Sequence, residues 1–172
     1  SPTNYSTGNN PYSVAAGDFN GDGRLDFVTA NAGSGNITVR LGNGDGWLGG
    51  ASNRVTGGGA GGVAGGQLNG DGYLDVVVAN SNPDTVSVLL GNGDGTFAAT
   101  VDYAVGSTPR SVALGDFNGD SALDVAALYA RWGYRSRLYP GCQADTGYLA
   151  GPDALRLADL HAALADDEVA AI

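Results

Sequence analysis

The nine residues Asp18-Phe-Asn-Gly-Asp-Gly-Arg-Leu-Asp26 form an acidic loop that occurs three times in this chain. The second copy is Gln67-Leu-Asn-Gly-Asp-Gly-Tyr-Leu-Asp75, and the third is Asp116-Phe-Asn-Gly-Asp-Ser-Ala-Leu-Asp124. Each copy begins 49 residues after the one before it. A repeat of this length is typical of a modular fold, in which one small unit is stacked several times.

The same spacing extends to the segments between the loops. Ile37-Thr-Val-Arg-Leu41 recurs as Val86-Ser-Val-Leu-Leu90, and the apolar runs are short and bounded by Gly, Asn and Asp. This pattern is typical of strands and turns. We therefore predict an all-β fold of three tandem repeats with four antiparallel strands each: a first at 12–17, 61–66 and 110–115, a second at 25–30, 74–79 and 123–129, a third at 36–41, 85–90 and 134–139, and a fourth clearest at 96–105.

The two ends of the chain differ from this pattern. We expect residues 1–151 to hold the repeats (about 12–60, 61–109 and 110–151), with 1–11 as an orphan outer strand. Residues 152–172 have a different pattern, with Pro152 near the start and leucines at spacings of three and four, which predicts a short helix. This C-terminal helix is interpreted as a cap over the last repeat or as a partner-binding helix.

The composition excludes several classes of function. The formal net charge is −10, there is no Lys, and the eight Arg are scattered, which argues against nucleic acid or an anionic membrane as partner. The sequence contains no run of 18 apolar residues, so we predict that no segment of it spans a membrane. Cys142 is the only cysteine, so it forms no internal disulfide, and we expect an inert thiol distant from the only histidine, His161. The chain starts without Met or a leader, as a mature secreted chain or an excerpt would.

Oxygen-bearing side chains alternate along each acidic loop. In the first copy Asp18, Asn20, Asp22 and Asp26 stand at positions 1, 3, 5 and 9, and position 7 would offer its backbone carbonyl. Oxygen-only ligands in a flexible loop suit Ca²⁺ better than Mg²⁺ or a transition metal. The loops hold eight of the seventeen Asp, so three Ca²⁺ would change the net charge from −10 to −4. Simple turn formation by Asn-Gly and Asp-Gly is the competing explanation.

The three predicted sites are unequal. Gln67 removes one charge from the second loop, and Ser121 replaces a turn glycine in the third. We expect the first site to bind Ca²⁺ most tightly and the second least tightly. The loop is not an EF-hand, because it lacks the Glu at position 12 and flanking helices. The predicted ligands are Asp18, Asn20, Asp22, Arg24 and Asp26; Gln67, Asn69, Asp71, Tyr73 and Asp75; and Asp116, Asn118, Asp120, Ala122 and Asp124.

The loop with its preceding Val-Ala strand and following Leu-Asp resembles the FG-GAP/VCBS repeat of integrin α-subunit propellers and of many secreted proteins. The element Leu90-Gly-Asn-Gly-Asp-Gly-Thr-Phe97 is also similar to the VCBS form. The resemblance covers residues 1 to about 150. It implies four-stranded propeller blades, with Ca²⁺ held in the loop between the first two strands of each blade and an extracellular, secreted or cell-surface location.

The number of blades sets a limit on the architecture, because closed propellers typically have four to eight. Three repeats therefore predict a partial or open propeller. The chain is either a piece of a larger propeller or an open stack whose ends pair with neighbouring subunits. Exposed edge strands favour such association, and residues 1–6 would then complete a blade of the next molecule.

Three functions compete on the sequence. The first is a calcium-binding extracellular module that acts in adhesion, in binding a protein or glycan, or as a structural subunit of an assembly or filament. The second is a lectin in which Trp47 and Trp132 stack on sugar rings, although we favour the interpretation that they are blade-packing or surface aromatics. The third is a non-catalytic accessory domain of a secreted enzyme. We expect no enzyme, because every clustered carboxylate belongs to a loop. Asn4 and Asn36 fit the N-glycosylation pattern.

Overall fold

The computed structural model describes residues 3–116 and 122–129, and every regular element in those ranges is a β-strand. The prediction of an all-β fold is thus confirmed for the described residues. The predicted C-terminal helix over 152–172 and the predicted third strand of the last repeat at 134–139 lie outside them. No helix in the described ranges has the length and apolar character needed to cross a membrane.

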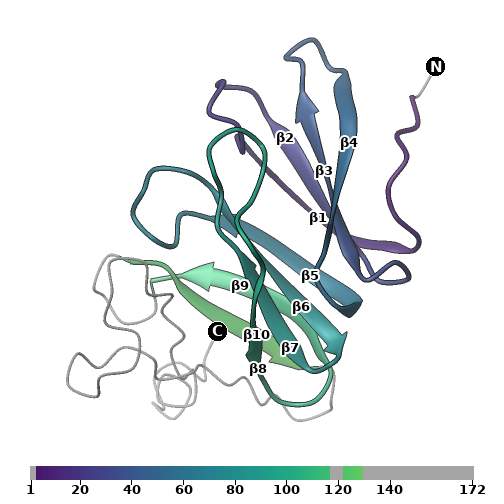
Figure 1. The fold of residues 1–172 in the computed structure, drawn as a ribbon, viewed down its shortest axis with the longest axis vertical. Coiled ribbons are helices and arrows are strands. Elements are labelled where there is room, and N and C mark those ends of the chain that lie inside the picture. Colours follow the sequence, from purple (N-terminus) through teal and green to yellow (C-terminus); the bar gives the residue numbers. More distant parts are fainter. Residues whose placement is uncertain (1–2, 117–121, 130–172) are drawn as a thin grey trace, which may run out of the picture.

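The strands form three antiparallel sheets, one for each repeat, which we call blades 1, 2 and 3 (Figure 1). Strand order in the two complete sheets follows the sequence, so each strand pairs with its neighbours along the chain. Blade 1 consists of β1 (Pro11–Gly17), β2 (Asp26–Asn31), β3 (Asn36–Gly42) and β4 (Leu48–Val55). Blade 2 consists of β5 (Gly58–Gly66), β6 (Asp75–Asn82), β7 (Thr85–Leu89) and β8 (Val101–Ala104). Blade 3 is described by β9 (Pro109–Gly115) and β10 (Asp124–Tyr129).

Strand pairing keeps the 49-residue period of the sequence. Val28 lies opposite Val39 in blade 1, and Val77 lies opposite Val88 in blade 2. The innermost strands β1, β5 and β9 lie next to one another, so the blades stack face to face from a shared inner edge (Figure 1). The predicted four-stranded antiparallel unit is confirmed for the first two repeats.

Two apolar layers lie between the three blades. The first joins blades 1 and 2, and the second joins blades 2 and 3. Blade 2 is therefore buried on both faces, which explains the uninterrupted run Val76-Val77-Val78-Ala79, because each face of a strand takes every second residue. The first layer contains Phe19, Val28, Ala30, Ile37, Val39, Ala60, Val63, Val76, Val78, Leu89 and Phe97. The second contains Leu68, Val77, Ala79, Val86, Val88, Val112, Val125 and Ala127.

Phe97 explains why β8 is shorter than the predicted strand at 96–105. Its ring is buried and meets the ring of Phe19 edge to face, with the centroids 6.0 Å apart. Phe97 makes one isolated bridge to Gly91, and regular pairing with β7 resumes only at Val101. Regular pairing with β7 is thus interrupted where the Phe97 ring packs against Phe19 of the first acidic loop.

A polar ladder crosses each complete blade at the same register. In blade 1, Asn31 donates to the Thr38 hydroxyl (2.9 Å), which in turn donates to Asn53 Oδ1 (2.7 Å). The ladder of blade 2 uses Asn80, Ser87 and Asp102, with distances of 2.7 and 2.5 Å. Most polar atoms of these side chains pair with one another inside the sheet, where a buried polar group without a partner is costly. The exception in blade 2 is Asn80 Oδ1, which is buried and accepts no hydrogen bond.

A residue with left-handed backbone lies directly before each innermost strand or at its start. These residues are Asn10 (φ 51°), Gly59 (φ 67°) and Thr108 (φ 55°), each 49 positions after the one before. Two of the three are non-glycine residues, for which this conformation is uncommon, so its recurrence is a fixed feature of the repeat. The same backbone switch therefore starts every repeat.

Within the predicted orphan strand at 1–11, the described residues 3–10 form no strand, and β1 begins at Pro11. A strand requires a partner, and this segment instead crosses the outward face of blade 1. Its bonds to the blade are made largely by side chains: Arg40 donates to the carbonyl of Ser6 (3.0 and 2.8 Å). The backbone N–H of Gly8 donates to Thr38 Oγ1 (3.2 Å).

Candidate metal centre

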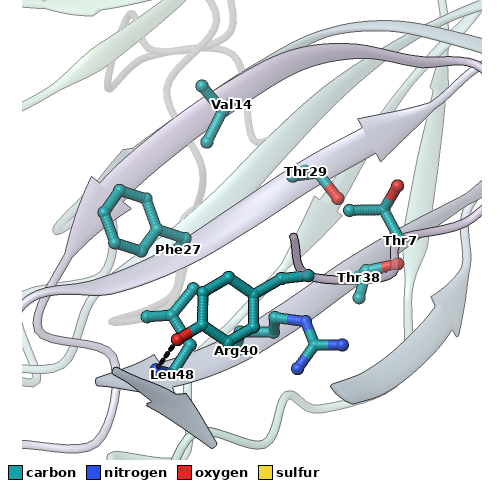
Figure 2. Close-up of a pocket in the computed structure, with 8 residues that line it drawn as sticks. Thr7, Val14, Phe27, Thr29, Thr38, Arg40 and Leu48 are labelled. Carbon is teal, nitrogen blue, oxygen red and sulfur yellow. Dashed lines mark hydrogen bonds between the residues drawn. The ribbon is translucent and has the colours of Figure 1, made fainter. Parts of the chain in front are cut away.

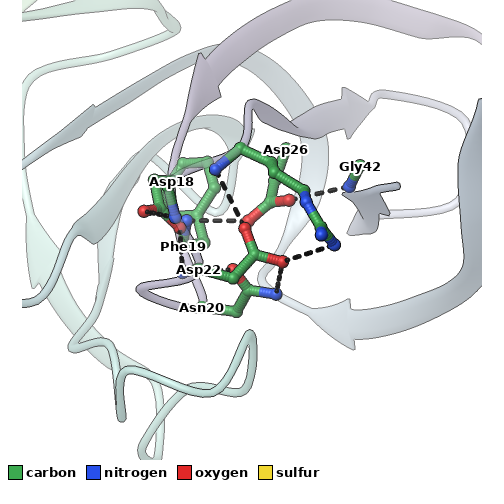
Figure 3. A network of polar contacts seen from close by, with 8 residues as sticks. Asp18, Phe19, Asn20, Asp22, Asp26 and Gly42 are labelled. Carbon is green, nitrogen blue, oxygen red and sulfur yellow. Dashed lines mark hydrogen bonds and ion pairs between the residues drawn. The ribbon is translucent and has the colours of Figure 1, made fainter. Parts of the chain in front are cut away.

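The first acidic loop connects β1 to β2 and folds around its own side chains (Figure 3). The Asp18 carboxylate accepts the backbone N–H groups of Asp22 (3.1 Å) and Gly23 (2.7 Å). These bonds, above all that from Gly23, lower the pKa of the Asp18 carboxyl below its ordinary value of 3.8. Gly21 and Gly23 have positive φ values of 72° and 79°, which glycine adopts without steric cost. The loop therefore holds an ionised carboxylate at its first position.

Positions 3 and 5 of the first loop gather beside Asp18. Asn20 Oδ1 accepts the N–H of Asp22 (3.2 Å), and its amide donates to Asp22 Oδ2 (3.0 Å). The other Asp22 oxygen accepts the N–H of Arg24 (2.9 Å). The Arg24 guanidinium lies 3.6 Å from Asp22 Oδ2, so a positive group already faces this carboxylate. The structure thus brings together the predicted ligands at positions 1, 3 and 5.

Asp26, at position 9, is placed differently from the other predicted ligands. It is fully buried, and its two oxygens accept the backbone N–H groups of Phe19 and Gly42, both at 2.8 Å (Figure 3). The carboxylate therefore fastens the loop to the end of β3. A carboxylate oxygen that accepts one hydrogen bond retains a second lone pair, so Asp26 remains a predicted ligand with a structural role besides.

Glycine is required where this carboxylate meets the backbone. A Cβ at Gly42 would overlap the carbonyl oxygen of Leu25, and a Cβ at Gly91 would overlap the carbonyl oxygen of Leu74. The close approach of these two backbone segments lets Asp26 reach the Gly42 N–H. The 49-residue recurrence of Gly42 as Gly91 is the sequence signal for this contact.

The second loop, between β5 and β6, repeats the arrangement with one change. Gln67 stands in the position of Asp18, and its Oε1 accepts the N–H of Gly70 (2.7 Å). Its amide group instead donates to Asp71 Oδ1 (3.2 Å), while the Asn69 amide donates to Asp71 Oδ2 (2.8 Å). Two neutral N–H donors thus surround a single carboxylate. This loop offers less negative charge to a cation than the first loop does.

Asp75 repeats the buried position of Asp26. Its oxygens accept the backbone N–H groups of Gly91 and Leu68, both at 2.8 Å. Burial raises the pKa of the Asp75 carboxyl above 3.8, and the two backbone hydrogen bonds oppose that shift. The second loop is therefore fastened to Gly91, just after the end of β7, whereas the first is fastened to the last residue of β3.

The third loop is described only in part. Asp116 is exposed at the end of β9, and Asp124 is buried at the start of β10, opposite Gly115. The predicted ligands Asn118 and Asp120, together with the Ser121 substitution, lie outside the described residues.

The described donors suit a hard cation, because the side chains at positions 1, 3 and 5 offer only oxygens as ligand atoms. No group of three His, Cys, Asp or Glu side chains gathers as a metal site in residues 3–116 and 122–129. Positions 1, 3 and 5 would supply at most two carboxylates to each site, together with amide oxygens, and the buried carboxylate at position 9 remains a predicted ligand. The carbonyls of Arg24, Tyr73 and Ala122 remain predicted ligands.

Trp47 is the tryptophan within the described residues, and its side chain is exposed. Trp47 follows the turn between β3 and β4, is 55% exposed, and donates its backbone N–H to Asp45 Oδ1 (2.9 Å). Trp132 lies outside the described residues.

Sequence reasoning missed two features. One is the pair of buried backbone contacts of Asp26 and Asp75, which the motif presented as metal ligands only. The other is a groove on the outward face of blade 1 (about 220 Å³), lined in part by Tyr5, Phe27 and Arg40. Its lining residues come from several separate segments and share no motif.

The fold and loops define a class of protein: tandem four-stranded antiparallel repeats, each with an acidic loop between its first two strands. Comparison with protein families matches the FG-GAP-like repeat to residues 19–78 and 67–127, which together cover more than half of the chain. The chain belongs to the FG-GAP-like repeat family. The LD-carboxypeptidase N-terminal domain also matches, over residues 110–172. Comparison with curated proteins found no match.

Proposed function

We propose that this chain is a calcium-binding, extracellular repeat module that acts in adhesion or binding, or as a structural subunit of a larger assembly. The observation that carries the proposal is the gathering of oxygen side chains at positions 1, 3 and 5 in both fully described loops. In the first loop these are Asp18, Asn20 and Asp22.

Calcium would serve the architecture of the blades. Each loop joins the first two strands of a blade, and in blades 1 and 2 its ninth residue fastens it to the chain at, or just after, the end of the third strand. A cation bound by the loop would neutralise carboxylates such as Asp18 and Asp22, which otherwise repel each other. Because it would bind the native state and not the unfolded chain, it would stabilise the fold by mass action.

The loops supply different ligand sets. The first offers two surface carboxylates, whereas the second offers one, with the Gln67 amide directed at Asp71. We infer that up to three Ca²⁺ bind, one in each loop, and that the second site is the weakest, because ligand charge sets calcium affinity.

Isothermal titration of the metal-stripped chain with CaCl₂ tests the proposal. We expect heat from at least two classes of site, loss of the tightest class in Asp22→Ala, and loss of the weakest in Asp71→Ala. Asp45→Ala is the matched control, because Asp45 is an exposed turn aspartate outside the loops and its removal should leave binding unchanged. A titration without heat, and a melting temperature that EDTA does not alter, would refute calcium binding.

The partner of such a module would be a protein or a glycan at the blade surfaces, and neither nucleic acid nor a membrane suits the charge of −10. A lectin function is the alternative that the exposed Trp47 ring favours, because sugar rings stack on such aromatics. A glycan array distinguishes the two: specific binding that Trp47→Ala abolishes would establish the lectin, and binding to protein partners alone would exclude it.

An enzymatic alternative rests on a different observation, the match of residues 110–172 to the LD-carboxypeptidase N-terminal domain. We propose that the chain is not catalytic, since β9 and β10 of that region complete the repeat array against blade 2. Incubation with peptides that end in an L,D bond tests this. Release of the C-terminal residue, tracked by mass spectrometry, would refute this proposal and show that the chain hydrolyses such peptides.

A further inference from the structure

The outward face of blade 1, which faces away from blade 2, carries a groove that none of the described blades covers (Figure 2). The floor comes from the strands of the blade, and the wall comes from the segment that precedes β1. The groove has a volume of about 220 Å³, and its main lining residues are Tyr5, Val14, Phe27, Thr29, Arg40 and Leu48. The lining is largely apolar, with one cation in Arg40.

This face has the same register as a face that is covered in blade 2. Phe27, Thr29 and Arg40 stand 49 positions before Val76, Val78 and Leu89. Those three residues of blade 2 are fully buried, because blade 1 packs against them. The outward face of blade 1 is thus the side of a blade that receives another blade elsewhere in the same molecule.

The N-terminal segment supports this interpretation, because it lies where the chain would leave a neighbouring blade. Tyr5 aligns with Tyr103 of β8, which packs into the layer between blades 2 and 3. Tyr5 likewise lies on blade 1: its hydroxyl accepts the backbone N–H of Leu48 (3.0 Å), and Arg40 lies over its ring at 5.3 Å.

The next residues repeat the connector between β4 and β5. Gly8 aligns with Gly57, and a Cβ at either residue would lie within 3 Å of the polar ladder beneath it, against Asn36 and Asn31 at Gly8 and against Asn80 at Gly57. Residues 3–8 therefore occupy the position that the outer strand and connector of a further blade, next to blade 1, would take. None of the described residues supplies the other strands of such a blade.

We propose that the outward face of blade 1 and residues 3–8 form an interblade docking surface for a blade of a second copy of this chain. The surface continues the blade-to-blade interface already present twice in the molecule. The contact joins unlike faces, so it is heterologous and builds rings or open chains of subunits.

This proposal deepens the structural-subunit form of the proposed function and rests on it. Sedimentation velocity of the full chain across a range of concentrations tests it, and we expect dimers and larger species to grow with concentration. Phe27→Asp should abolish them, because the variant places a carboxylate in the apolar face. Val55→Asp is the matched control, since Val55 is an exposed valine outside the groove and its change should leave assembly intact.

Several outcomes would overturn the proposal. A monomer at every concentration would do so and would assign the face to a preceding repeat of a longer chain. Assembly that Phe27→Asp leaves unchanged would also overturn it. If Phe27→Asp fails to fold by circular dichroism, Thr29→Glu on the same face takes its place, with the same expected loss of assembly.

The failure of docking is distinguishable from the failure of calcium binding. Hydroxyl-radical footprinting in CaCl₂ and in EDTA should show Tyr5 and Phe27 protected as the chain assembles, whereas the exposed Val101 of β8 keeps its reactivity. Protection of β8 instead of the groove would overturn the docking proposal. If the calcium titration gives no heat but Tyr5 is still protected on assembly, the calcium proposal is refuted and the docking proposal stands.

Discussion

The carboxylate of Asp26 accepts the backbone N–H of Gly42 at 2.8 Å, which links the end of the first acidic loop to the end of the third strand. The same carboxylate holds the N–H of Phe19 at the start of the loop. One buried side chain thus fastens three segments of the blade. The relationship recurs between Asp75 and Gly91, so it belongs to the repeat and not to a single site.

Loss of this carboxylate should destabilise the chain whether or not calcium is present. Asp26→Ala leaves two buried N–H groups without acceptors, at a cost of about 2–5 kcal/mol in the free energy of unfolding. Chemical denaturation in EDTA measures it, with Asp45→Ala as the exposed control. A loss seen only in calcium would show that Asp26 acts through the metal alone.

Gly42 should not tolerate a side chain, because a Cβ there overlaps the backbone carbonyl oxygen of Leu25. We expect Gly42→Ala to cost about 1–3 kcal/mol, as overpacked sites do. Gly50→Ala is the control, since Gly50 lies in β4, has an ordinary backbone φ, and has no heavy atom within 4 Å of the place that a Cβ would take. Thermal melts of the two variants should therefore differ clearly, and equal melting temperatures would contradict the close approach.

The second loop should gain affinity when its missing carboxylate is restored. Gln67→Asp removes the amide that donates to Asp71 and adds a negative charge. We expect calcium to bind this loop roughly tenfold more tightly, which corresponds to about 1.4 kcal/mol. Calorimetric titration beside Gln67→Asn separates the effect of charge from that of side-chain length. Equal affinity in the two variants would argue against a carboxylate ligand at this position.

The pH dependence of the metal-free chain should carry a signature of Asp75. Burial raises its pKa, so the folded state favours the protonated carboxyl, and its contribution to stability falls as pH rises from 3.8 through the folded pKa. Asp94 has the opposite sign: the Thr96 hydroxyl lowers its pKa, and its contribution is lost as pH falls below 3.8. Carboxyl ¹³C titration by NMR measures both, and calcium should shift Asp75 alone.

The aromatic contact beneath the first loop should be a large contributor to stability. Phe97→Ala removes a buried ring that meets Phe19 edge to face, and such truncations cost about 3–5 kcal/mol. Denaturant unfolding measures the loss, and Phe97→Leu should recover most of it. An effect below about 1 kcal/mol for the alanine variant would mean that the layer between blades 1 and 2 collapses around the gap.

The repeat made much of this fold predictable, because period, strand pattern and turn residues all agree at 49-residue intervals. The strands of the first two repeats therefore follow from sequence. Contacts between repeats leave no local pattern in the sequence. The break in strand pairing that lets Phe97 pack against Phe19 could therefore not be predicted. The site divides in the same way. The oxygens of Asp18, Asn20 and Asp22 converge as alternation predicts, whereas the burial of Asp26 depends on a backbone contact with β3.

The left-handed backbone at Asn10, Gly59 and Thr108 has a consequence for how repeats are gained or lost in evolution. The same backbone conformation recurs at the start of each repeat, so the stretch from one of these positions to the next is one repeating cassette. Duplication or deletion of one cassette would join equivalent positions of two repeats, so the apolar packing between neighbouring blades would be preserved at the junction. The gene could thus grow or shrink in whole steps of 49 codons without a new core having to evolve.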